Sequence, residues 1–99
     1  GGSAGGHLSL MLGLNGDDGD SAASDPVLRA PARVKSVVAY YPPVDLRPIA
    51  GPNERFPALD FPPAQAAAIS PILFVDARDP ATLVVHGDAD ELVPLSSGQ

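Results

Sequence analysis

Residues 1–14 read GGSAGGHLSLMLGL and contain the pattern G-x-S-x-G, formed by Gly1, Ser3 and Gly5. The apolar run after the serine predicts a helix over residues 4–14 that is buried on several sides. Each glycine within it costs up to about 1 kcal/mol relative to alanine, so these glycines indicate close backbone approach. A flexible Gly/Ser-rich linker is the alternative, but linkers do not continue into an apolar helix. This stretch therefore predicts a strand-to-helix turn.

A serine in this pattern is typical of a nucleophile elbow, in which a sharp turn holds the residue in a strained backbone conformation. Side chains two residues before and two after the serine would collide there, so glycine is expected at both places. The helix that begins behind Ser3 directs N–H groups and its positive dipole end at a developing oxyanion. We expect Ser3 to be the nucleophile and the N–H of Ala4 to be one oxyanion donor. A phosphate-binding loop is disfavoured, because G-x-x-x-x-G-K-[ST] and a nearby lysine are both lacking.

Two strands are expected further along the chain. Residues 34–41, VKSVVAYY, are rich in β-branched and aromatic side chains and stop at two prolines. Their nearly continuous apolar character is typical of an interior strand of a parallel sheet, covered on both faces. Residues 81–86, ATLVVH, form the second strand, and residues 45–63 are a proline-rich surface excursion. The order helix, strand, excursion, strand predicts half of an α/β sheet.

The polar stretch HGDADELVP, residues 86–94, follows the second strand directly. Catalytic groups of open α/β sheets gather past the carboxyl ends of strands. Together with the elbow, this stretch resembles the α/β-hydrolase fold serine hydrolases of the esterase/lipase group, close to prolyl-oligopeptidase-like catalytic domains. VKSVVAYYPPVDL and SPILFVDARDPATLVVHGDADELVPL resemble further parts of that family in the same order. The resemblance implies a mostly parallel sheet flanked by helices.

The resemblance also implies the acid of the site. In that family the acid is the second aspartate of H-G-x-x-D-x-x-V-P, which is Asp90 here. Asp88 is the competitor, and we interpret it as a turn residue that bonds its own backbone. Ser3 before Asp90 also matches the order Ser, Asp, His of this fold.

Neither histidine of the chain fits the base. His7 points along the helix and His86 belongs to the loop in the family, so structural roles are expected for both. The resemblance places the base beyond residue 99 and the HGGG-type oxyanion segment before residue 1. We therefore expect residues 1–99 to be a partial α/β-hydrolase domain, from the nucleophile elbow to the acid loop, that is inactive and poorly folded alone.

The expected function is hydrolysis of a carboxylic ester through an acyl-enzyme and a Ser-His-Asp triad. This chemistry requires no metal and no organic cofactor, and its partner is a small-molecule ester substrate. A prolyl-oligopeptidase-like peptidase, acting on a peptide, is the alternative enzyme. A non-catalytic binding protein of the same fold is the alternative of another class, although a scaffold has no need of a strained elbow.

The amino-acid composition disfavours several classes of binding partner. The 99 residues carry a net charge of −6, which disfavours nucleic acid and anionic membranes. No apolar run approaches the roughly 20 residues that span a bilayer. The chain has no cysteine, so disulfides and thiolate zinc sites are excluded. Compartment and oligomeric state are not predicted.

Two smaller groups of residues allow alternatives. Asp17, Asp18 and Asp20 lack the spacing of a calcium loop and are expected to form an exposed acidic loop. Tyr40 and Tyr41 end a strand on its carboxyl side, where they either border a substrate pocket or pack in the core.

Overall fold

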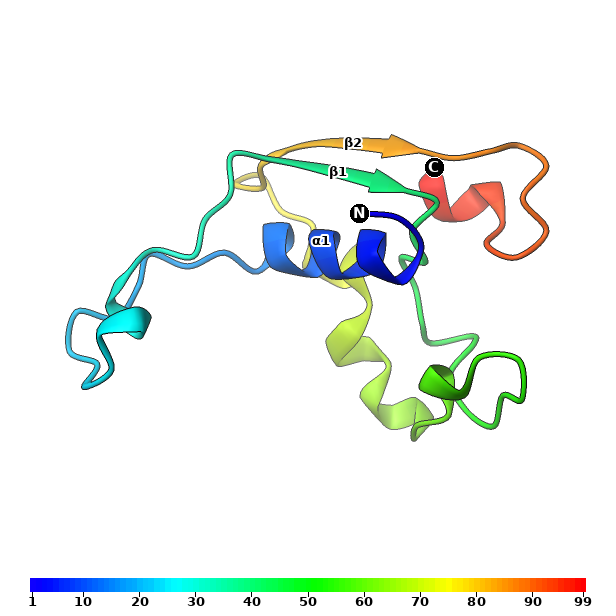
Figure 1. Cartoon of the computed structure of the whole chain (residues 1–99), viewed down its shortest axis with the longest axis horizontal. Coiled ribbons are helices and arrows are strands. Elements are labelled where there is room, and N and C mark those ends of the chain that lie inside the picture. Colours follow the sequence, from blue (N-terminus) through cyan, green and yellow to red (C-terminus); the bar gives the residue numbers. More distant parts are fainter.

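The computed structural model describes all residues 1–99 and contains a parallel sheet with one α-helix against it (Figure 1). Strands β1 (Ser36–Tyr40) and β2 (Ala81–Val85) are parallel, and Ser36 lies opposite Ala81 while Tyr40 lies opposite Val85. Both strands form where β-branched residues are concentrated. The predicted α/β class and the parallel pairing are confirmed.

The first two residues extend this sheet on the other side of β1. The Gly1 nitrogen donates to the Val38 carbonyl at 2.9 Å, and the Tyr40 N–H donates to the Gly1 carbonyl at 2.9 Å. Gly2 forms a parallel bridge with Tyr40. β1 therefore lies between the amino-terminal segment and β2, which confirms the prediction of an interior strand.

Helix α1 (Ala4–Leu14) has the bounds that its apolar run predicts and lies along one face of the sheet. Leu10 forms the core together with Val37 and Ala39 of β1. A Cβ atom on Gly13 would lie 2.4 Å from Cγ2 of Val37, and one on Gly6 would lie 3.2 Å from the Tyr40 carbonyl oxygen. These two glycines let the helix approach the strand closely, as expected.

The expectation that helix and strand are buried on several sides is wrong within residues 1–99. Exposed and buried residues alternate along β1, and only the face toward α1 is covered. On α1, Leu8 is 65% exposed and Leu12 is 56% exposed. The physical reason is that one α-helix covers one face of a sheet, and this chain contains a single α-helix.

The rest of the chain consists of loops and short 3₁₀ turns, most of which begin at a proline that fixes φ at the first position. The turns are η1 (Pro26–Arg29), η2 (Pro57–Leu59), η3 (Pro63–Gln65), η4 (Ala67–Ile69), η5 (Pro71–Phe74) and η6 (Leu95–Gly98).

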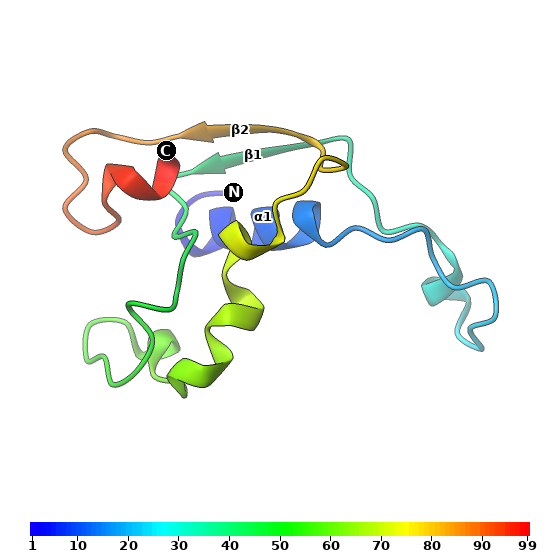
Figure 2. The ribbon, with the colours of Figure 1, turned by 180° about the vertical axis from the view of Figure 1, so that it is seen from behind.

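Two long segments leave the sheet in different directions. Figures 1 and 2 show that the loop after α1, which includes η1, projects beyond the amino ends of the strands. The excursion after β1 lies on the α1 side. None of the helices has the length and apolar character of a membrane span.

Candidate active site

Ser3 occupies a strained turn between the sheet and α1. Its φ of 49° and ψ of −120° lie outside the conformations that residues other than glycine ordinarily adopt. Ser3 is also the N-cap of α1, yet its hydroxyl forms no hydrogen bond to the helix. An N-cap serine normally accepts a bond from an N–H of the first turn, which stabilises the helix by about 1 kcal/mol. The hydroxyl of Ser3 is therefore not used for capping.

Backbone hydrogen bonds hold this turn in place. The Ser3 N–H donates to the Tyr40 carbonyl at 2.9 Å, and the Gly5 N–H donates to the Gly2 carbonyl at 2.8 Å. A Cβ atom on Gly1 would lie 2.5 Å from the Gly5 carbonyl oxygen, so glycine is required there. A Cβ atom on Gly5 would meet nothing within 4 Å. The expected collision exists at the first flank, and within this chain it is absent at the second.

The first turn of α1 leaves one N–H group beside Ser3. The N–H of Ala4 donates to no backbone carbonyl, whereas its neighbour Gly5 is bonded to Gly2. Unpaired N–H groups at a helix start favour negative charge, since the helix dipole is positive at that end. This arrangement is compatible with the predicted oxyanion donor.

Asp90 lies in the loop that follows β2, with its carboxylate fixed by that loop. One carboxylate oxygen, Oδ1, accepts the N–H of Leu92 at 2.9 Å and the N–H of Val93 at 3.0 Å. Donation from Val93 and Leu92, with a smaller contribution from His86, holds the pKa of the Asp90 carboxyl below its ordinary value. Asp90 is therefore ionised at neutral pH.

The expectation that Asp88 is the residue bonding its own backbone is wrong. Asp88 is exposed and its side chain accepts no hydrogen bond, whereas Asp90 bonds the N–H two residues ahead. The path of the loop decides which carboxylate bonds the backbone.

Both histidines are bonded to backbone carbonyls. His86 donates from Nε2 to the Val93 carbonyl at 2.7 Å, and the same nitrogen lies 3.6 Å from Oδ2 of Asp90. Its side chain is 3% exposed. His7 donates from Nε2 to the Ile69 carbonyl at 2.7 Å and so joins α1 to η4. These contacts agree with the structural roles expected for both rings.

The sheet order brings Ser3 and Asp90 to the same edge of the molecule. Ser3 follows the segment paired with one side of β1, and Asp90 follows β2 on the other side. Figure 1 shows both turns at the carboxyl ends of the strands. No hydrogen bond joins the two residues directly.

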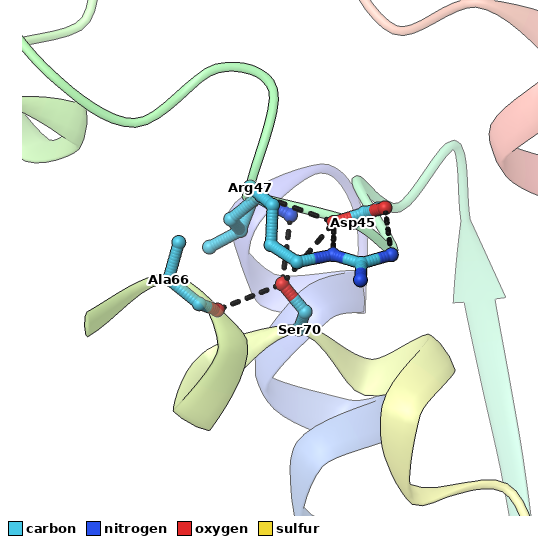
Figure 3. Close-up of polar contacts among 5 residues, drawn as sticks. Asp45, Arg47, Ala66 and Ser70 are labelled. Atoms are coloured by element: carbon cyan, nitrogen blue, oxygen red, sulfur yellow. Dashed lines mark hydrogen bonds and ion pairs between the residues drawn. The ribbon is translucent and has the colours of Figure 1, made fainter. Parts of the chain in front are cut away.

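A third polar cluster, which sequence analysis missed, holds the excursion to the chain after β1 (Figure 3). Arg47 donates to both carboxylate oxygens of Asp45, at 2.8 and 2.7 Å, and lowers the pKa of that carboxyl to about 2. The buried hydroxyl of Ser70 accepts the N–H of Leu46 at 2.9 Å and donates to the Ala66 carbonyl at 2.8 Å. The spacing D-x-R could have predicted the ion pair between Asp45 and Arg47. The role of the cluster is structural.

Two cavities of the chain lie outside the site. One of about 330 Å³ lies between the chain after β1 and the Asp90 loop, against Val44, Ile49, Leu92 and Val93. The other, of about 380 Å³, lies between α1, η5 and β2. Ser3 and Asp90 line neither of them. No three histidine, aspartate or glutamate side chains gather as metal ligands.

A match to a protein family shows which family the chain belongs to. The family model BD-FAE matches residues 1–99, the whole chain. The chain belongs to the BD-FAE family. This membership confirms the α/β-hydrolase resemblance of the sequence and its relationship to esterase domains. No curated protein sequence matches the chain.

Solved structures of esterases and of an ester hydrolase share this fold. An acetyl ester-xyloside bifunctional hydrolase from Caldicellulosiruptor lactoaceticus is 29% identical, with a TM-score of 0.76 over 96% of this chain and 36% of its own. A truncated carbohydrate esterase from gut microbiota is 30% identical, with a TM-score of 0.71 over 96% of this chain and 41% of its own. Esterase 2 of Thermogutta terrifontis is 26% identical, with a TM-score of 0.67 over 98% of this chain and 34% of its own. The present chain thus spans well under half the length of these proteins.

Proposed function

We propose that this chain is the nucleophile-to-acid part of a longer esterase domain that hydrolyses carboxylic esters. The observation that carries the proposal is the conformation of Ser3, which is strained and does not cap α1. A serine hydroxyl kept out of helix capping by backbone strain has no structural use in this chain. The names of the similar solved structures, which are all esterases or ester hydrolases, support ester cleavage.

In the proposed reaction Ser3 attacks the acyl carbon, and a histidine outside residues 1–99 takes its proton. Asp90 orients that histidine through Oδ2, because Oδ1 is engaged by the N–H groups of Leu92 and Val93. The N–H of Ala4 stabilises the oxyanion of the tetrahedral intermediate. The alcohol leaves, and water then releases the acyl group. No step of this scheme requires a metal or an organic cofactor.

The peptidase alternative uses the same residues on an amide. None of the similar solved structures described above is named as a peptidase, so no observation favours peptide cleavage over ester cleavage. The substrate we propose is therefore a small-molecule ester.

A fluorophosphonate probe on the full-length protein tests the assignment of Ser3. Wild type should be labelled, Ser3→Ala should not, and kcat for p-nitrophenyl acetate should fall by about 10⁵- to 10⁶-fold in the variant. Ser9→Ala is the matched control, because Ser9 lies in the same helix and its hydroxyl is bonded to the Gly5 carbonyl at 2.8 Å. This control should be labelled like wild type.

Two other results would redirect the proposal. Absence of labelling in wild type would favour the non-catalytic binding protein, and labelling of Ser3→Ala would exclude Ser3 as the nucleophile. Residues 1–99 produced alone should hydrolyse no p-nitrophenyl ester, since losing the base abolishes activation of the serine. Turnover by this piece that Ser3→Ala removes would contradict the need for a further histidine.

A further inference from the structure

The structure contains two strained residues other than glycine, and they lie beside each other. Ser3 has a φ of 49° and Tyr41 has a φ of 40°, both in the left-handed region. The Ser3 N–H donates to the carbonyl of Tyr40, and the N–H of the next residue, Tyr41, donates to the Val85 carbonyl at 2.7 Å. Tyr41 thus stands at the end of β1, between the strand ends that lead to the two proposed catalytic residues.

A bulky aromatic side chain is an unusual occupant of this conformation. Glycine and asparagine adopt positive φ with far less steric conflict, so a turn with only a backbone role would favour them at position 41. Strain of this kind persists where the surrounding structure enforces it, and it gathers at functional sites. The bond from the Tyr41 N–H to the Val85 carbonyl helps to hold this conformation, but it does not explain the choice of tyrosine.

The ring of Tyr41 occupies the space beside Gly2 of the elbow. Its Oη lies 3.1 Å from the place where a Cβ of Gly2 would be, immediately before the nucleophile. The side chain is 45% exposed, which excludes core packing in this chain as its role. Its phenolic O–H forms no hydrogen bond in this chain, so the hydroxyl and the exposed part of the ring are available to a bound molecule.

Tyr40 provides an internal comparison. It is also 45% exposed, but it is the last residue of β1 and continues the alternation of that strand. Val37 and Ala39 face α1, so Tyr40 shares the opposite face with Val38. The left-handed turn at Tyr41 breaks this alternation and sends the second ring toward the elbow.

We infer that Tyr41 is a specificity-determining residue whose ring forms one wall of the ester-binding site beside Ser3. The inference rests on the proposed function and adds a substrate contact to it. The ring would limit the size of the acyl or alcohol group that fits next to the nucleophile. Apolar contacts of this kind change the preference between homologous substrates by about 10- to 200-fold.

The test measures kcat/KM of the full-length protein for two series of esters. p-Nitrophenyl acetate, butyrate and octanoate vary the acyl group, and methyl, phenyl and 1-naphthyl acetate vary the alcohol. The ratio between substrates within one variant does not depend on the folded fraction of that variant. Tyr41→Ala should change at least one series by about ten-fold or more in favour of the bulkier group, and the series that changes identifies the contacted group.

Two further variants make the result specific. Tyr41→Gly removes the ring while suiting the positive φ, so it should show the same change without the strain. Tyr41→Phe keeps the ring and should stay within about two-fold of wild type in both series. Wild-type ratios in both Tyr41→Ala and Tyr41→Gly, with probe labelling intact and dependent on Ser3, would overturn the inference alone. Labelling that does not depend on Ser3 would instead overturn the proposed function.

Discussion

The elbow at Ser3 and the loop that carries Asp90 lie at the same edge of the sheet but are held in different ways. The elbow depends on distant partners, because its N–H is bonded to Tyr40 of β1 and its segment is paired with that strand. The Asp90 loop depends on itself, since its bonds run between His86 and Val93. The nucleophile is thus positioned by sheet register and the acid by a local turn.

Because of this difference, mutations can disturb the nucleophile and the acid separately. A change that shifts β1 relative to the first residues moves the proposed nucleophile, whereas the acid loop would keep its own bonds. Conversely, a change inside the loop leaves the sheet intact and affects only the orientation of the carboxylate. Mutations that shift the elbow should therefore lower both activity and stability, whereas mutations in the acid loop should lower mainly activity.

After the loss predicted above for Ser3→Ala, the largest effect is expected at the acid. Asp90→Ala in the full-length protein should lower kcat by about 10⁴-fold, because the histidine that takes the proton of Ser3 loses its orientation. Asp88→Ala is the matched control, since Asp88 is exposed and bonds nothing, and its kcat should remain near that of wild type. Steady-state hydrolysis of p-nitrophenyl acetate measures both. A larger loss in Asp88→Ala would assign the acid to the other aspartate.

A smaller effect is expected at the first flank of the elbow. Gly1→Ala places a Cβ 2.5 Å from the Gly5 carbonyl oxygen, so the turn must shift and Ser3 with it. Misplacement of a nucleophile by about 1 Å costs on the order of 100-fold in rate, and the melting temperature should fall as well. Gly5→Ala meets no atom of this chain and should change both quantities less. Equal losses in the two variants would show that the Gly1–Gly5 contact is not what holds the elbow.

The smallest effect concerns pH and distinguishes the two kinds of anchor. The pKa of Asp90 is lowered from 3.8, so the bonds of its carboxylate to Leu92 and Val93 are present above that pH and are lost as the pH falls through the lowered value. The amide NMR signals of Leu92 and Val93 should titrate with a midpoint below 3.8. The N–H groups of Ser3 and Gly5 donate to backbone carbonyls, so their amide signals should not titrate with this midpoint. Asp90→Asn should abolish the titration in the loop, and its persistence would assign it to another group.

Much of the fold was predictable because its signals are local. The apolar run behind Ser3 marked α1 from its first to its last residue, and β-branched residues marked both strands. β1 ends one residue earlier than the run VKSVVAYY indicated, because Tyr41 turns to positive φ. The apolar run did not reveal that only one face of β1 is covered within residues 1–99. Hydrophobic side chains show that a strand can be buried, but they do not show which segment covers each face.

The candidate site divides in the same way. The pattern G-x-S-x-G and the resemblance of residues 86–94 to a family loop were enough to predict Ser3 and Asp90 as site residues, and this stays a prediction. They were not enough to show which aspartate bonds the turn, or that a Cβ at Gly5 would meet open space. Those answers depend on where the backbone places neighbouring atoms, and the residue types are the same in either case.

By itself, therefore, the sequence determined the class of fold, the parallel strands and the identity of a serine set in a glycine-flanked turn. Each of these follows from short-range patterns of side-chain size and polarity. Only the tertiary structure decided that Ser3 and Asp90 share one edge and that Tyr41 leans on Gly2 beside the nucleophile. Both facts arise from hydrogen bonds between segments far apart in the chain, which no local pattern specifies.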